Sequence, residues 1–311
     1  MILITSAAGQ TGTRILSYLA RRGVAARGLV TNTASAEKIR ALGAEPVIGD
    51  LRDPLALDVA MQGVTKLYHI APSLTVREHE MGRGVIAAAQ RAGVKHFVLH
   101  GVIAPYLQHI NYHWAKELIQ FDLYRSGLPY TVLLPTNFMQ NVSWTWPLIA
   151  KDGRWELPYS TSQKLTWVDV DDVAEAAANI LTETGHEYGT YELCGTDAYL
   201  SRDEIARLMG EALGRPVRAV KANVEDYVAA CRTQPFFKRV TDEEFDQIRA
   251  MFIDYDTYGM PAGNPKVLSM LLRRAAGSYA DFVQKLASRL NGQHIESGPT
   301  QIVTDYSAIS S

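Results

Sequence analysis

The sequence predicts an α/β protein in which a doubly wound parallel sheet carries a smaller, mostly helical C-terminal cap. Three observations lead to this fold class. Strand-like and helix-like segments alternate up to residue 134, an order typical of a parallel sheet with helices on both faces. The first segment, residues 2–5, runs into a glycine-containing turn and then a helical pattern. After Pro135 the alternation gives way to aromatic residues and further helical segments.

Six strands are expected in the first half, each a short apolar run bounded by turn residues. In chain order they cover residues 2–5, 24–30, 45–48, 66–70, 96–99 and 130–134. The helices between them are expected at residues 11–22, 35–42, 55–62, 77–92 and 112–126. Each helix is followed by a glycine suited to a left-handed C-cap, namely Gly23, Gly43, Gly63, Gly93 and Gly127.

The second half is expected to complete the sheet and then to form the cap. Strands at residues 165–168 and 190–193 flank a helix at 171–181. Ser201 and Glu204 have capping-box spacing, and later helices are expected at residues 224–232, 242–252, 266–272 and 279–290. The predicted domains are a dinucleotide-binding domain over 1–150 with sheet-completing segments from 164–194, a cap over 195–290, and a polar tail over 291–311 of a kind that is often poorly ordered.

The composition is that of an ordinary globular protein. The chain has 311 residues, 47% of them apolar, and a formal net charge of -2, so it lacks the basic excess of a nucleic-acid-binding protein. No apolar run approaches the roughly 20 residues of a membrane span, and a strand stands where a signal segment would. Cys194 and Cys231 lack metal-type spacing and fit a reducing compartment. We therefore expect a cytoplasmic monomer or homodimer with a small-molecule substrate and no nucleic-acid or membrane partner.

The turn after the first strand predicts a dinucleotide site. The usual fingerprint has three glycines, whereas this chain reads S-x-x-G-x-x-G from Ser6 to Gly12. A strand that turns tightly into a helix leaves unpaired N–H groups aimed at one point, which together with the helix dipole favour a pyrophosphate. The expected contacts are Ser6, Ala7, Ala8, Gly9, Gln10, Thr11 and Gly12.

The second strand ends at Thr31 and Asn32. An acid here would bind the ribose of NAD and an arginine the phosphate of NADP, but this chain has neither. Thr31 and Asn32 can hydrogen-bond to a ribose or to a phosphate, so NAD and NADP both stay open. Lys38, further along the next helix, is either a phosphate ligand or part of a solvated helix face.

The next two strand ends offer the adenosine half of a cofactor further contacts. The third strand runs into Asp50 and Leu51. This carboxylate either accepts from an adenine amino group with Leu51 against the ring, or caps the next turn, or does both. The fourth strand ends at small residues that let a ribose lie against the backbone or simply form a turn, namely Ala71, Pro72 and Ser73.

The candidate catalytic residues follow the fifth strand. That strand ends at His100, and the next helix carries Tyr112, His113 and Lys116 at spacings that share one face. An ammonium so placed lowers the pKa of a phenol, which then exchanges a proton beside a nicotinamide; Lys116 could also hold the nicotinamide ribose. His109, His113 and Glu117 recur at four-residue spacing, which suits metal ligands on one helical face. The intervening residues match no zinc motif, so no metal is expected.

The sixth strand ends in polar amides beside aromatic residues. Such a sequence suits a nicotinamide carboxamide and a planar substrate, although a helix start with a buried Phe138 remains the alternative. The expected cofactor contacts are Pro135, Thr136, Asn137, Phe138 and Met139, and the expected substrate pocket is Phe138, Asn141 and Trp144. Trp146 and Trp155 are more typical of a core.

Taken together, these segments resemble the NmrA-like group of atypical short-chain dehydrogenases/reductases. The resemblance covers residues 1 to 290 and rests on the segments ITSAAGQTG, EPVIGDLRD, AGVKHFVLHG, HWAKELIQFDLYRSGLPYTVLLPTNFMQN, LTWVDVDDVAEAAANIL and NPKVLSMLLRRAAGSYADFV. It implies a Rossmann fold with a small C-terminal domain and an NAD(P)(H) cofactor. It also implies a pyrophosphate loop at 6–11, adenine contacts at 50–51, a cofactor lysine at Lys116 and a nicotinamide loop at 136–139.

Three positions depart from the family pattern. Ser6 replaces the first glycine, Thr31 the phosphate-binding arginine, and His100 the serine or threonine after the fifth strand. The resemblance implies an NAD(P)-dependent oxidoreductase that transfers a hydride to a quinone, enone or aldehyde. The missing serine and arginine favour the alternative, an NmrA-type redox sensor that binds the cofactor without turnover. An epimerase or lyase with tightly held NAD would need stronger acid/base pairs than the sequence offers.

Overall fold

The computed structural model describes residues 1–72, 75–234 and 237–291. Its centre is a seven-stranded sheet with strand order β10-β6-β5-β4-β1-β2-β3, in which every neighbouring pair is parallel. This confirms the predicted doubly wound sheet. Its strands are β1 (Ile2–Ile4), β2 (Ala26–Val30), β3 (Glu45–Ile48), β4 (Lys66–His69), β5 (His96–His100), β6 (Tyr130–Pro135) and β10 (Gly189–Leu193).

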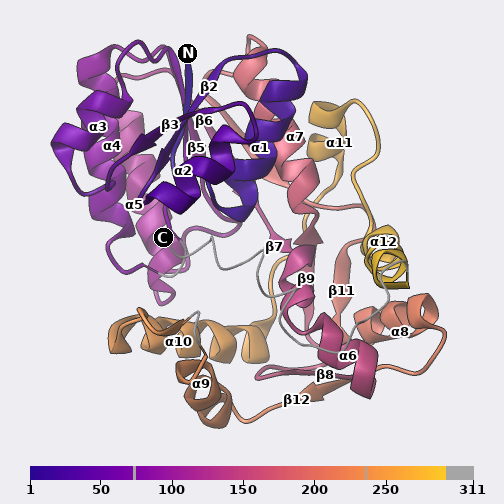
Figure 1. Ribbon diagram of the computed structural model, residues 1–311. Coiled ribbons are helices and arrows are strands. Elements are labelled where there is room, and N and C mark those ends of the chain that lie inside the picture. The colour runs from indigo at the N-terminus through magenta and orange to yellow at the C-terminus, as the bar shows by residue number, and fades with distance from the viewer. Residues whose placement is uncertain (73–74, 235–236, 292–311) are drawn as a thin grey trace.

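Helices cover both faces of this sheet (Figure 1). Alternate strand residues point to opposite faces, so Ile4 lies in one apolar core with α1, α2, α7 and α11, while Leu3 lies in the other with α3, α4 and α5. The helices of the first face are α1 (Gln10–Arg21), α2 (Thr33–Arg40), α7 (Val170–Thr182) and α11 (Lys266–Leu272). Those of the second face are α3 (Pro54–Ala60), α4 (Glu78–Ala92) and α5 (Asn111–Arg125).

The rest of the chain forms a second region around its own core, and this region contains two small sheets as well as helices. Strand β9 (Lys164–Val168), which the sequence placed among the sheet-completing segments, pairs instead with β7 (Asn137–Phe138) and β11 (Tyr199–Ser201). Strand β8 (Arg154–Leu157) pairs with β12 (Arg218–Lys221). The helices are η1 (Met139–Trp144), α6 (Trp146–Asp152), α8 (Arg202–Leu213), α9 (Val224–Arg232), α10 (Asp242–Tyr258) and α12 (Tyr279–Asn291).

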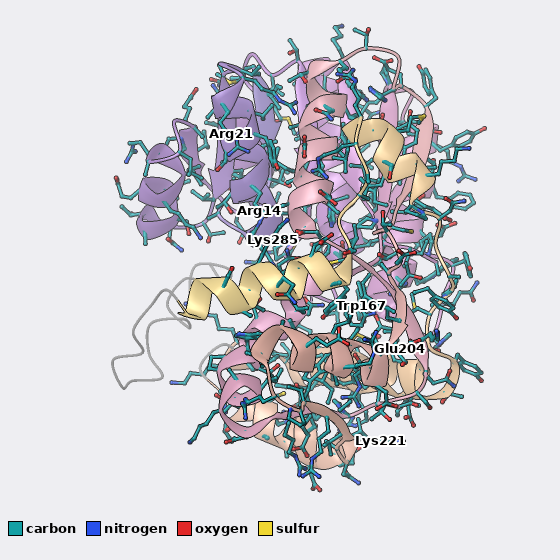
Figure 2. The ribbon with its side chains drawn as sticks, turned by 90° about the vertical axis from the view of Figure 1, so that its right-hand side faces the viewer. Arg14, Arg21, Trp167, Glu204, Lys221 and Lys285 are labelled. Atoms are coloured by element: carbon teal, nitrogen blue, oxygen red, sulfur yellow. The ribbon has the colours of Figure 1, made fainter. Side chains whose placement is uncertain are left out.

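Helix α12 lies across the junction between the two regions, as Figure 2 shows at Lys285. The second region holds Trp146, Trp155 and Trp167 in its core, as expected for the first two. Ser201 and Glu204 form the predicted capping box at the start of α8. Among the described residues, no helix is long and apolar enough to cross a membrane.

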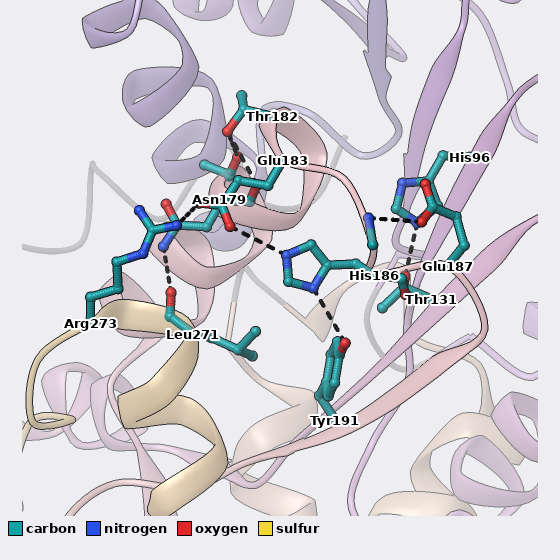
Figure 3. A network of polar contacts seen from close by, with 12 residues as sticks. His96, Thr131, Asn179, Thr182, Glu183, His186, Glu187, Tyr191, Leu271 and Arg273 are labelled. Carbon is teal, nitrogen blue, oxygen red and sulfur yellow. Dashed lines mark hydrogen bonds and ion pairs between the residues drawn. The ribbon is translucent and has the colours of Figure 1, made fainter.

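The amino ends of the central strands are tied together by a polar network (Figure 3). His96 Nε2 lies 2.8 Å from Thr131 Oγ1, and that hydroxyl donates to the carbonyl oxygen of His186. His186 reaches Tyr191 and Glu183, and Glu183 pairs with Arg273. These groups come from β5, β6, β10, the segment after α7 and, for Arg273, the end of α11, so the network fastens the edge strand β10 to the sheet.

Candidate functional site

The turn after β1 keeps the shape of a dinucleotide loop although its first glycine is replaced. Ser6 has a φ of 44°, in the left-handed region that glycine adopts without strain. The turn is held by the Ala7 N–H, which donates to the Leu29 carbonyl, and by the Gly9 N–H, which donates to the Ser6 carbonyl. Ser6 therefore holds this glycine-like conformation at a cost of about 1–2 kcal/mol.

The two remaining glycines let α1 approach this turn closely. A Cβ on Gly12 would lie 2.7 Å from the Ala7 carbonyl oxygen and 2.8 Å from that of Ser6. A Cβ on Gly9 would lie 3.1 Å from the Ser6 carbonyl oxygen. Only a residue without a side chain fits at position 12 unless the backbone shifts.

The amino end of α1 is open to an anion. Gly9 is its N-cap and supplies no side-chain hydrogen bond, so the first-turn N–H groups have no capping group. The Gln10 Nε2 is buried without a protein partner in the described residues. Ala7, Ala8 and Thr11 of the same turn are buried. A diphosphate would supply the acceptor oxygens that these donors lack, so the residues of the turn fit a dinucleotide.

At the end of β2, one expected contact is used by the protein itself. The Asn32 Oδ1 accepts from the Ser35 N–H at 2.8 Å and caps α2, while Thr31 is exposed. The Lys38 Nζ lies 3.2 Å from the Ala8 carbonyl oxygen and donates to it. Lys38 therefore reaches the glycine turn rather than extending from a solvated helix face.

At the end of β3, Asp50 pairs with Arg52 at 2.5 Å, and its Oδ1 accepts from the Arg52 N–H. The hydrogen bond from the Arg52 side chain lowers the pKa of this carboxyl group. Asp53 is the cap of α3, and Asp50 caps the turn before that helix, which is one of the two roles predicted for it. Leu51 is buried beside it.

At the end of β4, the backbone is tied to β1. The Thr5 hydroxyl donates to the Ile70 carbonyl oxygen at 2.8 Å and accepts from the Ile70 N–H. Ala71 and Pro72 follow with increasing exposure, next to the glycine turn along the sheet edge. Ser73 lies outside the described residues.

Buried histidines stand at the carboxyl ends of β4 and β5. The His100 Nδ1 lies 2.5 Å from the Tyr68 hydroxyl, and the His69 Nδ1 lies 3.0 Å from the Thr5 hydroxyl. Burial, assisted by the charge of Lys116, lowers the pKa of each histidine to about 3. Both imidazoles are therefore neutral at neutral pH and hydrogen-bond without carrying charge.

Lys116 on α5 is paired with Glu78, the first residue of α4. The Lys116 side chain is 16% exposed and that of Glu78 only 4%. Burial raises the pKa of Glu78, and the neighbouring ammonium opposes that rise. The predicted cofactor lysine thus stands beside His69 and His100 at the carboxyl edge of the sheet, held by an acid that the sequence analysis missed.

The expected effect of Lys116 on Tyr112 is wrong. The Tyr112 phenol is buried beside Tyr255 of α10, and burial raises its pKa well above the usual value. The Tyr255 hydroxyl in turn donates to Asn137 Oδ1 at 3.1 Å. Tyr112 therefore faces the second region, where the Lys116 ammonium does not lower its pKa.

The neighbouring His113 is a buried residue that is bonded to the backbone. Its Nδ1 lies 3.1 Å from the Ala104 carbonyl oxygen, and its Nε2 is buried without a protein partner in the described residues. Burial lowers its pKa to about 4. Like His69 and His100, it is neutral at neutral pH.

The segment after β6 connects the sheet to the second region. Thr136 bonds to the Leu193 carbonyl, and Asn137 and Phe138 form β7 beside β9. Phe138 is half-buried, with its ring centroid 6.1 Å from that of His100. Met139 is buried behind it.

The structure separates one expected pocket residue from this group. Asn141 is exposed on η1, and the Trp144 side chain lies outside the described residues. No group of three or more His, Cys, Asp or Glu side chains that could hold a metal occurs in the described ranges. The groups brought together at the sheet edge are Thr5, Tyr68, His69, Glu78, His100, Lys116 and Phe138.

Comparison with known proteins identifies the family of this chain. A model of the NmrA-like family matches residues 1–274. NAD(P)H azoreductase of Xenophilus azovorans is 34% identical over 227 residues, which cover 72% of this chain and 78% of that protein. Quinone oxidoreductase 2 of Escherichia coli is 29% identical over 295 residues, covering 92% of this chain and 98% of that protein.

The fold has a solved counterpart. The crystal structure of the NADPH-dependent quinone oxidoreductase of Escherichia coli complexed with NADPH aligns with a TM-score of 0.79 and 27% identity, covering 92% of this chain and 99% of that one. By their names, both the azoreductase and this quinone oxidoreductase use a reduced nicotinamide cofactor. The match over 274 residues and the similarity to these proteins show that this chain belongs to the NmrA-like family.

Proposed function

We propose that this chain is an NAD(P)H-dependent reductase that passes a hydride to a small conjugated acceptor of the quinone or azo class. The observation that carries the proposal is the amino end of α1, which has no capping side chain and which Gly12 brings close to the turn after β1. It lies at the same edge of the sheet as Lys116 with its partner Glu78. The acceptor class is supported by the quinone and azo compounds in the names of the relatives.

In this proposal the bound nicotinamide supplies the hydride. The turn from Ser6 to Gly12 binds the diphosphate with backbone N–H groups, and Asp50 and Leu51 lie along the edge as adenine contacts. Lys116 holds the nicotinamide ribose through N–H donors that Glu78 does not use. Phe138 forms an apolar wall that positions a planar acceptor.

A quinone or azo acceptor takes up a proton together with the hydride, and in this proposal the proton comes from solvent water rather than from Tyr112. Because burial holds the Tyr112 phenol neutral with a raised pKa, that group is a weak acid at neutral pH. His100, neutral and beside Phe138, is better suited to donate a hydrogen bond to an acceptor oxygen or nitrogen. Its imidazole orients the acceptor, and Tyr68 fixes the ring from the opposite nitrogen.

The test is a turnover assay with NADPH and NADH against quinones, azo dyes, enones and aldehydes. Oxidation of the cofactor in the presence of a quinone or an azo dye is the expected result. The matched variant is Gly12→Ala, whose added Cβ would collide with the Ala7 carbonyl and should weaken cofactor binding. Tight binding by calorimetry without turnover of any acceptor would refute the reductase and support the redox-sensor alternative.

The cofactor preference rests on position 31. Thr31 is exposed and carries no charge, so we propose that the chain discriminates weakly between NADH and NADPH. Thr31→Arg supplies a guanidinium for the 2′-phosphate and should tighten NADPH binding about tenfold relative to NADH. Equal affinity of the variant for both cofactors would contradict this placement of the phosphate.

A further inference from the structure

We propose that Glu78 is a positioning residue, which holds the Lys116 ammonium in place for the nicotinamide ribose. This inference rests on the proposed function, because the ribose is present only if the chain binds the dinucleotide. It concerns a residue 38 positions away from Lys116 in the sequence, on a different helix.

Close packing of α4 against α5 brings the two side chains together. A Cβ on Gly82 would lie 2.5 Å from Ile119 Cγ1, so the missing side chain at position 82 sets the spacing of the helices. Gly82 lies one turn after Glu78, and Ile119 lies about one turn after Lys116. The ion pair therefore stands one turn from the closest helix contact, at the end of α4 that faces the site.

Glu78 balances the charge of Lys116, because the other titratable side chains around the ammonium are neutral. The side chains whose pKa values respond to Lys116 come from β4, β5, α4 and α5. Three of them, His69, His100 and His113, are neutral at neutral pH. Without Glu78 the ammonium would be a largely buried cation among neutral imidazoles, which is an unfavourable arrangement.

The number of N–H donors on Lys116 allows the ammonium to bind Glu78 and a ligand at the same time. An ammonium has three N–H donors, and among the described residues Glu78 is the ion-pair partner of Lys116. A carboxylate on one side of the nitrogen fixes the position of the ammonium. The remaining donors are then available to two ribose hydroxyls.

The experiment is calorimetric titration of Glu78→Gln with NADPH and NADP⁺ from about pH 6 to about pH 9. Glutamine preserves the shape of the side chain but removes the charge. We expect the affinity to fall about tenfold at neutral pH. The wild-type affinity should fall towards the acid end of this range, because burial raises the pKa of Glu78 and protonation removes its charge. The Glu78→Gln variant should lack this pH dependence.

Two further variants separate positioning from folding. Glu80→Gln removes an exposed acid from the same first turn, where it pairs with Arg77, and should leave binding unchanged. Glu78→Asp keeps the charge and should recover part of the affinity and most of the wild-type pH profile. Thermal unfolding of each variant shows whether a loss of binding follows from a loss of structure.

The decisive measurement is a double-mutant cycle with Lys116→Met. If Glu78 acts through Lys116, Glu78→Gln should have no further effect on binding once the ammonium is gone. Equal losses in both backgrounds, or a Glu78→Gln variant with the wild-type affinity and pH profile, would overturn the inference while leaving the proposed function intact. Failure of the wild-type protein to bind any dinucleotide would instead overturn the proposed function.

Discussion

Both regions of the molecule bury a cation, and the two cations are satisfied in different ways. In the second region, Arg202 is completely buried and donates to the carbonyl oxygens of Leu157, Tyr159 and Val220. Its guanidinium also lies 4.6 Å from the ring centroid of Tyr159. At the sheet edge, Lys116 has an ion pair with Glu78 and three neutral histidines around it.

The difference separates a structural cation from a binding one. The carbonyls around Arg202 come from β8, β12 and the segment after β8, so the guanidinium joins these segments and uses its donors within the protein. Lys116 uses one side of its ammonium for Glu78 and retains donors for a ligand. A buried cation whose hydrogen bonds are all made within the protein indicates a structural role. A buried cation that keeps unused N–H donors near an uncapped helix end indicates a ligand-binding role.

The largest expected effect is a loss of stability in acid, which should come from the buried histidines around Lys116. The folded-state pKa values of His69 and His100 are lowered to about 3, and that of His113 to about 4. Because the unfolded chain binds these protons near pH 6.5, stability is fully present above that pH. It is lost as the pH falls towards 4, by about 1.4 kcal/mol per pH unit for each histidine.

Urea unfolding at several pH values between about 7 and 4 measures this loss. His69→Asn should reduce the slope by about one proton, since asparagine does not titrate in this range. The described residues of the second region from 195 onwards include no histidine. The surroundings of Arg202 should therefore contribute nothing to this histidine-dependent loss of stability. A free energy of unfolding that stays constant down to pH 4 would contradict the buried, neutral state of the cluster.

Replacing the structural cation should cost stability rather than binding. Arg202→Met removes the donors to several buried carbonyls and should lower the free energy of unfolding by about 3–5 kcal/mol. The matched control is Arg207→Met, on the same helix but in an exposed ion pair with Glu211, which should change stability by less than about 0.5 kcal/mol. Equal effects of the two variants would remove the basis of the comparison.

Replacing the binding cation should reverse that pattern. Lys116→Met should weaken NADPH binding by about 1.5–3 kcal/mol, since it removes charged hydrogen bonds to the ribose. Its effect on stability should be smaller than that of Arg202→Met, because Glu78, with its raised pKa, can accept a proton once unpaired. Calorimetry and urea unfolding of the same preparation measure both quantities. A Lys116→Met protein that binds NADPH normally would show that the lysine is not a ligand.

The sequence predicts the parts of this comparison that depend on local pattern. Alternating apolar segments predict the seven strands of the sheet, and Lys116 follows from its place after the fifth strand. The role of Glu78 cannot be predicted from the sequence in this way, because an acid in the first turn of a helix usually lies on the surface. Tyr112 shares a helix with Lys116, but the packing of α10 places the phenol beside Tyr255. Long-range packing of this kind leaves no local signal.

Arg202 shows the same limit in the second region. Arg202 lies between the two residues of a capping box that the sequence does predict. An arginine in the first turn of a helix is normally expected to be exposed. Its burial depends on Trp155, Tyr159 and β12, which lie far from it along the chain or form a different element. The helix could be predicted from its cap, but the role of its first residue could not.

The smallest expected effect concerns the glycine turn that supplies the other half of the binding site. Ser6 holds a φ of 44°, which costs about 1–2 kcal/mol for a residue with a Cβ. Ser6→Gly relieves that strain but increases the entropy of the unfolded chain, which offsets about 0.5–1 kcal/mol. The net gain should be about 0.5 kcal/mol in urea unfolding, with Ser6→Ala, which keeps the Cβ, close to the wild type. A loss of stability in Ser6→Gly would show that the serine contributes an interaction worth more than the strain it carries.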